Sequence, residues 1–247
     1  MAKFAVIMPA AGKSSRFTGK EKKPFALLDG RAVWLRAAEL FVTRDNIIQT
    51  LLVIDPADRE LFDRRFQANI AFMNVKLVDG GAERFDSVAN AIALLKDDVE
   101  FVAIHDAVRP CTTSELIDAT FDAAVKNGAA IPAIRVADTL KQVGADKVIQ
   151  ATPPRADLWF AQTPQVFRKD WLVEAYANRG NVVGTITDDA QLVEASGHPV
   201  HVVDGDPTNI KITSFKDLFL AEAILKSRPK PKAKGPSHPF ADEEMWR

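Results

Sequence analysis

The sequence predicts an α/β protein with a Rossmann-like, doubly wound and mostly parallel sheet, from which a β-hairpin arm projects. Two observations support this prediction: short apolar runs alternate with segments of helical spacing, and the alternation breaks once, over residues 138–155. Strands that alternate with helices are typical of parallel sheets built from βαβ units. At 247 residues, of which 47% are hydrophobic, the chain can bury one large core.

The first expected strand, at residues 3–8, is an uninterrupted apolar run, as in a strand buried on both faces. The other expected strands are short segments rich in apolar residues, and they lie at residues 47–54, 75–78, 100–105, 129–136, 199–203 and 209–213. The expected helices share apolar residues at helical spacing, and they lie at residues 32–43, 56–68, 86–95, 112–128, 169–177, from 187 onward, and 214–225. Thr112 with Glu115 predicts a capping box, and Thr187 and Ser214 are the expected caps of the two last helices.

One domain over residues 1–226 accounts for these elements, and its arm covers residues 138–155. Within the arm, two short strand-like segments flank a turn at Gly144, and an isolated two-stranded hairpin is marginally stable in water. We therefore expect the arm to pack against a second copy of the chain. Residues 227–247 form a tail rich in Pro and Lys, which is either a mobile linker or a segment that docks through Phe240 and Trp246.

Charge and composition exclude several classes of protein. The formal net charge of -1 provides no overall field that would favour nucleic acid or an anionic membrane surface. The single cysteine, Cys111, permits no internal disulfide and is typical of a reducing compartment. The N-terminal apolar run is too short for a signal peptide core, and no stretch reaches the roughly 20 apolar residues of a membrane span. We expect a cytoplasmic protein that binds neither nucleic acid nor membrane.

The residues after the first expected strand are typical of a phosphate-binding loop. Small residues at positions 9–12 would let a ligand approach the backbone N–H groups closely. A P-loop is excluded because Ile7 stands where its first glycine belongs, and a dinucleotide fingerprint is excluded because only Gly12 of its three glycines is present. Five cations follow within eleven residues, opposed only by Glu21: Lys13, Arg16, Lys20, Lys22 and Lys23. The pattern suits a nucleoside triphosphate, although an ordinary strand-to-helix loop with a solvated basic face would also produce it.

Two further expected strands end in polar clusters, at residues 80–84 and 105–110. Ligands of doubly wound sheets bind beyond the carboxyl ends of the strands. We therefore expect these two clusters and the loop at 9–24 to lie on one rim and to form one site.

Motifs along the whole domain resemble those of one enzyme family. They are residues 9–12 with Arg16 and Lys23, 79–81 through Ser87, 105–110, 138–141, 155–165, 187–188 and 209–213. In number, order and spacing they resemble the 2-C-methyl-D-erythritol 4-phosphate cytidylyltransferases of the non-mevalonate isoprenoid pathway, from Phe4 to about Leu225. The resemblance implies transfer of a cytidylyl group from CTP to that polyol phosphate, with diphosphate leaving and no covalent enzyme intermediate.

The resemblance also implies roles for individual residues. The catalytic residues would be Arg16, Lys23, Arg155 and Lys211. Arg16 and Lys23 would hold the triphosphate and stabilise charge on the α-phosphate. Arg155 and Lys211 would hold the sugar phosphate, together with Arg109, Thr139 and Thr187. Asp106 would bind Mg²⁺, which prefers one or two carboxylates together with phosphate oxygens and water. Its alternative role is a helix cap or a partner for Arg109, and the alternative for Arg109 and Lys211 is a solvated rim cation. The substrate-binding positions would be Pro9, Ala10, Ala11, Gly12, Gly81, Ala82, Ser87, Asp106, Ala107, Arg109, Thr139 and Thr187.

The resemblance places arm residues Thr139 and Arg155 at the nucleotide site of a neighbouring subunit, and so implies a homodimer. His105 is expected to be structural, because the attacking phosphate is already ionised near neutral pH and needs no general base. Three residues depart from the family pattern: Pro24, Ala82 and Arg135.

Three rival functions stay open. A ribitol 5-phosphate cytidylyltransferase shares several motifs, although Pro-Ala-Ala-Gly at 9–12 and His-Asp-Ala at 105–107 count against it. A sugar-phosphate transferase that uses UTP or GTP is more distant. A catalytically silent nucleotide-binding module is disfavoured because the chain carries all four residues assigned to chemistry: Arg16, Lys23, Asp106 and Lys211.

Overall fold

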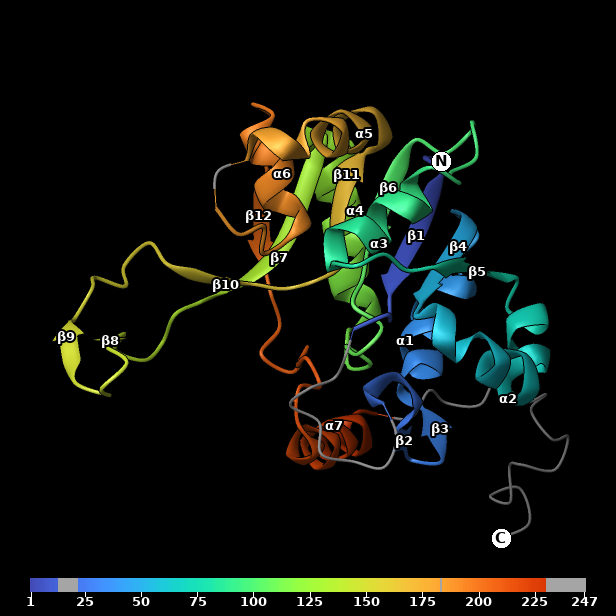
Figure 1. Cartoon of the computed structure of the whole chain (residues 1–247), viewed down its shortest axis with the longest axis horizontal. Helices are drawn as coiled ribbons and strands as arrows, with labels where there is room; N and C mark the ends of the chain where they lie inside the picture. Colours follow the sequence, from blue (N-terminus) through green and yellow to red (C-terminus); the bar gives the residue numbers. More distant parts are fainter. Residues whose placement is uncertain (13–21, 183, 230–247) are drawn as a thin grey trace, which may run out of the picture.

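A computed structural model describes residues 1–12, 22–182 and 184–229 of the chain (Figure 1). Its helices and strands, in chain order, are β1 (Phe4–Pro9), the 3-10 helix η1 (Lys23–Phe25), β2 (Leu27–Leu28), β3 (Arg31–Ala32), α1 (Val33–Val42), β4 (Ile47–Ile54), η2 (Pro56–Asp58), α2 (Arg59–Phe72), β5 (Val75–Asp79), α3 (Arg84–Ile92), β6 (Phe101–Ile104), α4 (Ser114–Asn127), β7 (Ala129–Arg135), β8 (Gln142–Val143), β9 (Ile149–Ala151), β10 (Trp159–Ala161), β11 (Gln165–Arg168), α5 (Lys169–Ala177), η3 (Arg179–Asn181), α6 (Asp189–Ala195), β12 (His201–Asp204) and α7 (Phe215–Ser227).

A mostly parallel sheet lies at the centre of the molecule, as the sequence predicts. Its strand order is β10-β7-β11-β6-β1-β4-β5, and β12 pairs with β7. The β1, β4, β5 and β6 strands are parallel to one another, whereas β10 and β11 run antiparallel to their neighbours. The loops that follow β1, β4, β5 and β6 therefore meet at one edge of the sheet.

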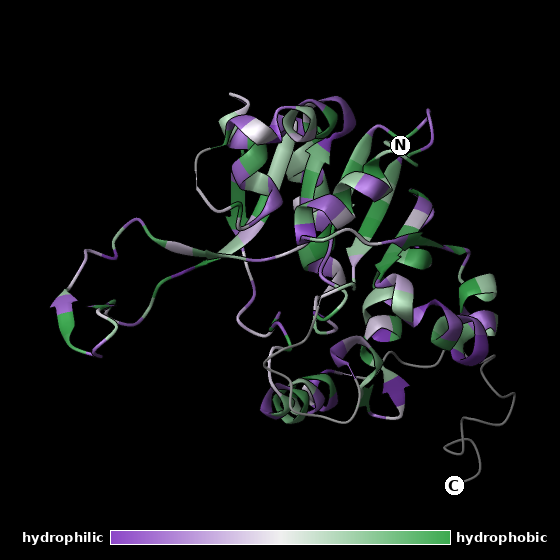
Figure 2. Ribbon diagram, viewed as in Figure 1, coloured by the Kyte–Doolittle hydropathy of each residue, from purple (hydrophilic) through white to green (hydrophobic). Residues whose placement is uncertain are grey.

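Each face of the sheet carries its own layer of helices. Alternate side chains of β1 point to opposite faces: Val6 and Met8 pack with α1, α2 and α4, whereas Ala5 and Ile7 pack with α3, α5 and α6. This burial on both faces explains the uninterrupted apolar runs of the central strands (Figure 2). Among the described residues, no helix is long and apolar enough to cross a membrane.

A third apolar cluster lies beyond the carboxyl ends of the strands, where α7 packs near β2 and β3 (Figure 1). Ile212 and Leu218 are buried there with Leu28 and Cys111. The backbone N–H of Ile212 donates to the carbonyl of Val108 at 2.9 Å. This bond ties the segment before α7 to the loop after β6, so that both segments border the same edge of the sheet.

The predicted hairpin arm is confirmed. β8 pairs antiparallel with β9, and the arm extends far from the body of the molecule (Figure 1). At its base, the guanidinium of Arg135 lies 4.2 Å from the centre of the Trp159 ring, across the antiparallel pair of β7 and β10. This cation–π contact gives Arg135 a physical role at a position where the family usually has a small residue or Pro.

Pro24, another departure from the family pattern, occupies the first turn of η1. A backbone N–H has no partner within the helix at that position, so proline costs nothing there. The next residue, Phe25, is buried and its ring contacts those of Phe62 and Phe66.

Two predicted helix caps are wrong by one residue. Thr113, not Thr112, caps α4, because its hydroxyl accepts a hydrogen bond from the N–H of Leu116. Thr112 is fully buried and serves a polar network instead. Similarly, Asp188 rather than Thr187 caps α6, because the Asp188 carboxylate accepts from the N–H of Gln191 at 3.1 Å.

The predicted strand at residues 209–213 is also wrong, and β2, β3, β10 and β11 were not foreseen. The apolar pattern at 209–213 reflects burial of Ile212 in the third cluster, with no strand neighbour. All four missed strands are short, and β10 and β11 pair with strands distant in sequence, so local pattern alone did not mark them.

We predict that Asp217 stabilises α7 and that its contribution depends on pH. Its carboxylate accepts hydrogen bonds from the N–H groups of Thr213 and Ser214, both at 2.7 Å, in a capping box with Ser214. Burial alone would raise the pKa of Asp217, but these hydrogen bonds outweigh burial and lower it. Asp217→Ala should reduce the free energy of unfolding by about 1 kcal/mol near neutral pH.

Because the folded-state pKa is depressed, this contribution is present above the pKa of the unfolded chain and is lost as the pH falls through the folded-state pKa. Urea unfolding near neutral pH and at about pH 3 measures the contribution of Asp217 at each pH. Lys226→Ala, which removes an exposed pair with Glu222, is the control and should change stability less. An equal loss for Asp217→Ala at both pH values would contradict the prediction.

Candidate active site

Two clefts meet at the carboxyl edge of the sheet. The larger, with a volume of about 750 Å³, is lined by Pro9, Ala10, Ala11, Gly12, Lys23, Pro24, Asp55, Pro56, Gly81, Ala82, Glu83, Arg84, Ser87, Asp106, Val108 and Lys211. The smaller, of about 250 Å³, is lined by Arg84, Asp106, Arg109, Ala161, Gln162, Thr163, Gln165, Thr187, Asp188 and Lys211. Arg84, Asp106 and Lys211 line both clefts and therefore form a shared wall between them.

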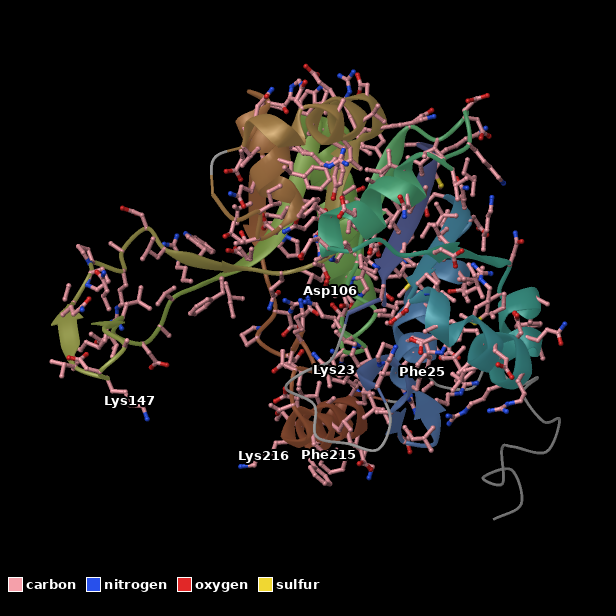
Figure 3. All side chains as sticks on the ribbon, in the orientation of Figure 1. Lys23, Phe25, Asp106, Lys147, Phe215 and Lys216 are labelled. Atoms are coloured by element: carbon pink, nitrogen blue, oxygen red, sulfur yellow. The ribbon has the colours of Figure 1, made fainter. Side chains whose placement is uncertain are left out.

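The larger cleft gathers most of the predicted nucleotide-binding residues. The predicted residues found there are Pro9, Ala10, Ala11, Gly12, Lys23, Gly81, Ala82, Ser87, Asp106 and Lys211. Figure 3 shows Lys23 and Asp106 near the carboxyl edge of the sheet, with Lys147 far away on the arm. The structure thus brings together residues from the loops after β1, β5 and β6 and from the segment before α7.

Gly80 lets the β5 loop approach the β1 loop closely, and Gly81 lets it turn tightly onto the start of α3. A Cβ at Gly80 would lie 2.6 Å from the Cβ of Ala11, and a Cβ at Gly81 would lie 2.5 Å from the Cβ of Asp86. Ser87 holds the turn, because its hydroxyl accepts from the N–H of Gly81 and donates to the carbonyl of Glu83, both at 3.0 Å. Ala82, where the family often has an acid, presents only a methyl group to the cleft.

The basic loop at residues 13–21, including Arg16, lies outside the described residues. The chain re-enters the described structure at Lys22, whose ammonium group pairs with Asp55 at 3.0 Å and with Asp58 at 2.8 Å. These two ion pairs fix Lys22 beside Asp55, which lines the larger cleft.

The remaining predicted site residues are distributed more widely. Arg109 and Thr187 line the smaller cleft. Ala107 is fully buried, and Val108 lines the larger cleft in its place. Thr139 and Arg155 are exposed on the arm, away from both clefts, and the Arg155 guanidinium donates to the carbonyl of Ala137.

The carboxylate of Asp106 is surrounded by three cations. Its Oδ2 lies 2.9 Å from the Lys211 ammonium and 3.4 Å from Nε of Arg109, and its Oδ1 lies 3.8 Å from Nη2 of Arg84. The side chain is only 9% exposed. Burial alone would raise the pKa of Asp106, but the three cations outweigh burial and hold it well below its usual range. Asp106 is therefore ionised at neutral pH, and it pairs with Arg109 while also facing both clefts.

A buried polar network supports Asp106 from below. The N–H of Asp106 donates to Oγ1 of Thr163 at 3.2 Å, and the Thr163 hydroxyl contacts Nδ1 of His105 at 3.1 Å. Nε2 of His105 lies 3.1 Å from the carbonyl of Arg109. A carbonyl can only accept, so Nε2 carries the proton and Nδ1 accepts from Thr163.

His105 is thus fully enclosed in this network and lines neither cleft. Burial lowers its pKa to about 4, which keeps the ring neutral near neutral pH. These contacts fit the structural role expected for His105.

Asn209 connects the network to the segment that carries Lys211. Its Nδ2 donates to the carbonyl of Thr163 at 2.9 Å, and its Oδ1 accepts from the hydroxyl of Thr112 at 2.8 Å. Its own carbonyl accepts from Nη1 of Arg109 at 2.7 Å. The loop after β6 and residues 209–211 therefore form one hydrogen-bonded unit.

Several residues that line the clefts had been given no individual role from the sequence: Asp55, Pro56, Glu83, Arg84, Val108, Gln165 and Asp188. Of these, Asp55 and Pro56 also lay outside the clusters and motifs expected at the site. Arg84 is the most important, because it belongs to the shared wall. The sequence already placed Arg84 in the polar cluster after β5. It did not show which residues would orient the Arg84 side chain.

A doubly wound α/β sheet with two clefts that share a charged wall has the arrangement of a nucleotidyltransferase. The family model for 2-C-methyl-D-erythritol 4-phosphate cytidylyltransferase (IspD) matches residues 4–227. The chain belongs to this family.

Relatives and solved structures of the same name cover almost the whole chain. The enzyme of that name from Geobacillus thermodenitrificans is 39% identical over 227 residues, which are 91% of this chain and 98% of the relative. The one from Alkaliphilus oremlandii is 36% identical over 229 residues, which are 92% and 97% of the two chains. The crystal structure of the Thermus thermophilus enzyme superposes with a TM-score of 0.73 at 32% identity, covering 90% of this chain and 98% of the other.

We predict that His105 makes the protein less stable in acid. Because its pKa falls from 6.5 to about 4 on folding, its neutral form contributes stability that is present above pH 6.5 and is lost as the pH falls toward 4. The slope of unfolding free energy against pH gives the number of extra protons that the unfolded chain binds. In His105→Asn, this number should be smaller by about one over this window.

Urea unfolding at several pH values gives these slopes. His201→Asn is the control, since His201 is exposed on β12. If His105→Asn and the unaltered protein have equal slopes, His105 does not carry this acid sensitivity.

Proposed function

We propose that this protein transfers a cytidylyl group from CTP to 2-C-methyl-D-erythritol 4-phosphate. The products would be 4-diphosphocytidyl-2-C-methyl-D-erythritol and diphosphate, in isoprenoid precursor biosynthesis. The observation that carries the proposal is the shared wall of Arg84, Asp106 and Lys211 between two clefts. The larger cleft suits the nucleotide, the smaller suits the acceptor phosphate, and the two substrates would meet at this wall. The names of the relatives from Geobacillus and Thermus support the same reaction.

The reaction forms a bond between an acceptor phosphate oxygen and the α-phosphorus of CTP. It breaks the bond between that phosphorus and the bridging oxygen, and diphosphate leaves with the electron pair. Such chemistry asks the protein mainly for positioning and for stabilisation of charge. Lys23 and Lys211 supply cations in the larger cleft, and Arg109 supplies a cation in the smaller one. Arg16 would add a further cation from the basic loop.

The residues present fit a magnesium ion. Mg²⁺ takes one or two carboxylates together with phosphate oxygens and water, and Asp106 is an ionised carboxylate on the shared wall of the clefts. Bound there with the triphosphate, the ion would neutralise charge on the phosphates. Lys211, Arg109 and Arg84 hold Asp106 ionised before the substrates arrive.

The test of this function is release of diphosphate from CTP in the presence of magnesium. We expect turnover with 2-C-methyl-D-erythritol 4-phosphate, little with ribitol 5-phosphate, and little when UTP or GTP replaces CTP. Asp106→Asn should lower turnover by at least about 10², and it should also lower the thermal midpoint, because it leaves the cations around the buried side chain uncompensated. Turnover with ribitol 5-phosphate alone, or with UTP or GTP alone, would replace the proposal by one of its rivals, and no turnover with any pair would favour a silent nucleotide-binding module.

The arm supports a homodimer as part of the same proposal. It exposes apolar side chains at Val143, Val148 and Ile149, whose exposed fractions are 49%, 59% and 57%. A two-stranded hairpin with such a surface gains stability when two copies pair about a twofold axis. Thr139 and Arg155 would then complete the partner's site from outside. A cytoplasmic location belongs to this proposal too, and the free thiol of Cys111 is consistent with it.

We predict that Lys23→Ala and Arg155→Ala, each nearly inactive alone, restore activity when mixed. If the arm acts in trans, each mixed dimer has one site with both lesions and one intact site. Random reassortment of two equal pools should then restore about a quarter of all sites. Diphosphate release from the co-expressed pair measures this. Absence of rescue in demonstrated mixed dimers would show that the arm serves its own subunit.

A further inference from the structure

A series of charged and polar side chains leads from the shared wall of the clefts into the core. Nη2 of Arg84 lies 2.7 Å from Oδ2 of Asp189 and 3.8 Å from Oδ1 of Asp106. The other oxygen of Asp189 accepts a hydrogen bond from the hydroxyl of Tyr176 at 2.5 Å. Asp189 is fully buried and Tyr176 is 3% exposed. Of Arg84, Asp189 and Tyr176, Arg84 alone lines a cleft.

The carboxylate of Asp189 is held by the elements around it. Asp189 is the first residue of α6, and its N–H donates to Oε1 of Gln165 on β11 at 3.1 Å. Nε2 of Gln165 donates to the cap residue Asp188 at 2.8 Å. Because Tyr176 comes from α5, three elements fix the position of Asp189.

Arg84 and Tyr176 both keep their protons near neutral pH. Burial would lower the pKa of Arg84, but Asp189 and Asp106 outweigh burial and raise it, so the guanidinium stays charged. Burial, followed by the charge of Asp189, raises the pKa of Tyr176, so its hydroxyl remains a donor.

Arg84 contacts the side of Asp106 that the other cations leave. Lys211 and Arg109 both approach Oδ2, whereas Arg84 approaches Oδ1. Rotation of the carboxylate about its Cβ–Cγ bond moves both oxygens. Cations at both oxygens therefore restrict this rotation more than cations at one oxygen alone. A buried ion pair is weak support for stability in itself, so this placement calls for another role.

We propose that Arg84 is a positioning residue of the reaction: the buried Asp189–Tyr176 pair fixes its guanidinium, and Arg84 in turn sets the orientation of the Asp106 carboxylate between the two clefts. The inference rests on the proposed function for the role of Asp106. The link itself, from Tyr176 through Asp189 and Arg84 to Asp106, involves only residues of this protein. Tyr176 lines neither cleft and acts at a distance, through two intervening side chains.

Tyr176→Phe tests the link, because it removes one hydroxyl and no contact with a cleft. It should weaken binding of CTP, measured by calorimetry with magnesium and without acceptor, by about fivefold. It should also lower kcat by about tenfold, since small errors of position are costly in the transition state. In an Arg84→Lys background, the same change should have almost no further effect on either quantity.

Thr120→Val is the matched control. Thr120 is fully buried on α4, and its hydroxyl donates to the carbonyl of Leu116 at 2.7 Å. Loss of this buried hydroxyl should lower the thermal midpoint much as Tyr176→Phe does, but leave CTP affinity and kcat within about twofold. If Arg84→Lys does not fold, an Asp106→Asn background replaces it for the binding measurement.

The outcomes separate this link from the proposed function. Equal losses of CTP affinity from Tyr176→Phe in both backgrounds, or a lower thermal midpoint with unchanged affinity and kcat, would overturn the link and leave the reaction standing. The expected coupling in CTP binding without product from 2-C-methyl-D-erythritol 4-phosphate would keep the link and overturn the reaction. Failure of the unaltered protein to bind CTP would overturn both.

Discussion

The buried carboxylate of Asp106 is the group on which the rest of the site depends. Its charge is compatible with its burial only because Lys211, Arg109 and Arg84 surround it. These cations come from the segment before α7, the loop after β6 and the start of α3, which are far apart in the sequence. One negative charge therefore gathers three distant segments, and their own positive charges would otherwise repel one another.

The polar network below Asp106 gives this electrostatic arrangement its rigidity. Attraction between charges has little directional preference, whereas hydrogen bonds constrain both distance and angle. The Thr163 hydroxyl accepts from the backbone N–H of Asp106, and the Asn209 amide donates to the backbone carbonyl of Thr163. These bonds therefore determine where the charged groups are held. The apolar cluster around Ile212 includes Cys111, which precedes Thr112 of this network in the chain. Charge, hydrogen bonding and packing thus act in successive layers beneath the clefts.

The sequence predicts the parts of this architecture that depend on local pattern. The runs that form β1 and β6 are apolar throughout, and the small residues at 9–12 after β1 directly indicated a wall of the larger cleft. Residues 209–213 misled the prediction, because an apolar residue buried in a loop gives the same pattern as a strand. The cap of α6 was misplaced because Thr187 and Asp188 are both good caps, and only the fold decides which side chain accepts from the backbone N–H of Gln191.

Arg84 shows a different limit of sequence reasoning. Its role comes from Asp189 and Tyr176, which lie about a hundred residues away and approach it only when α3, α5 and α6 pack on the same face of the sheet. No spacing rule connects these positions. The arm was easier to foresee, because its break in the βα alternation is local, although the contact of Arg135 with Trp159 at its base again joins two separate strands.

The strand order has a consequence for how the protein is made. β1 emerges from the ribosome before the other strands of the sheet, yet it lies in the middle of the sheet, between β4 and β6. One edge of β1 can pair once β4 (Ile47–Ile54) has emerged, whereas the other edge stays open until β6 (Phe101–Ile104) has emerged. Lys211, which lines both clefts, is made about a hundred residues later still. Pairing between strands that are distant in sequence slows folding and leaves apolar edges exposed for longer, so the topology that concentrates the loops at one edge also delays completion of the clefts.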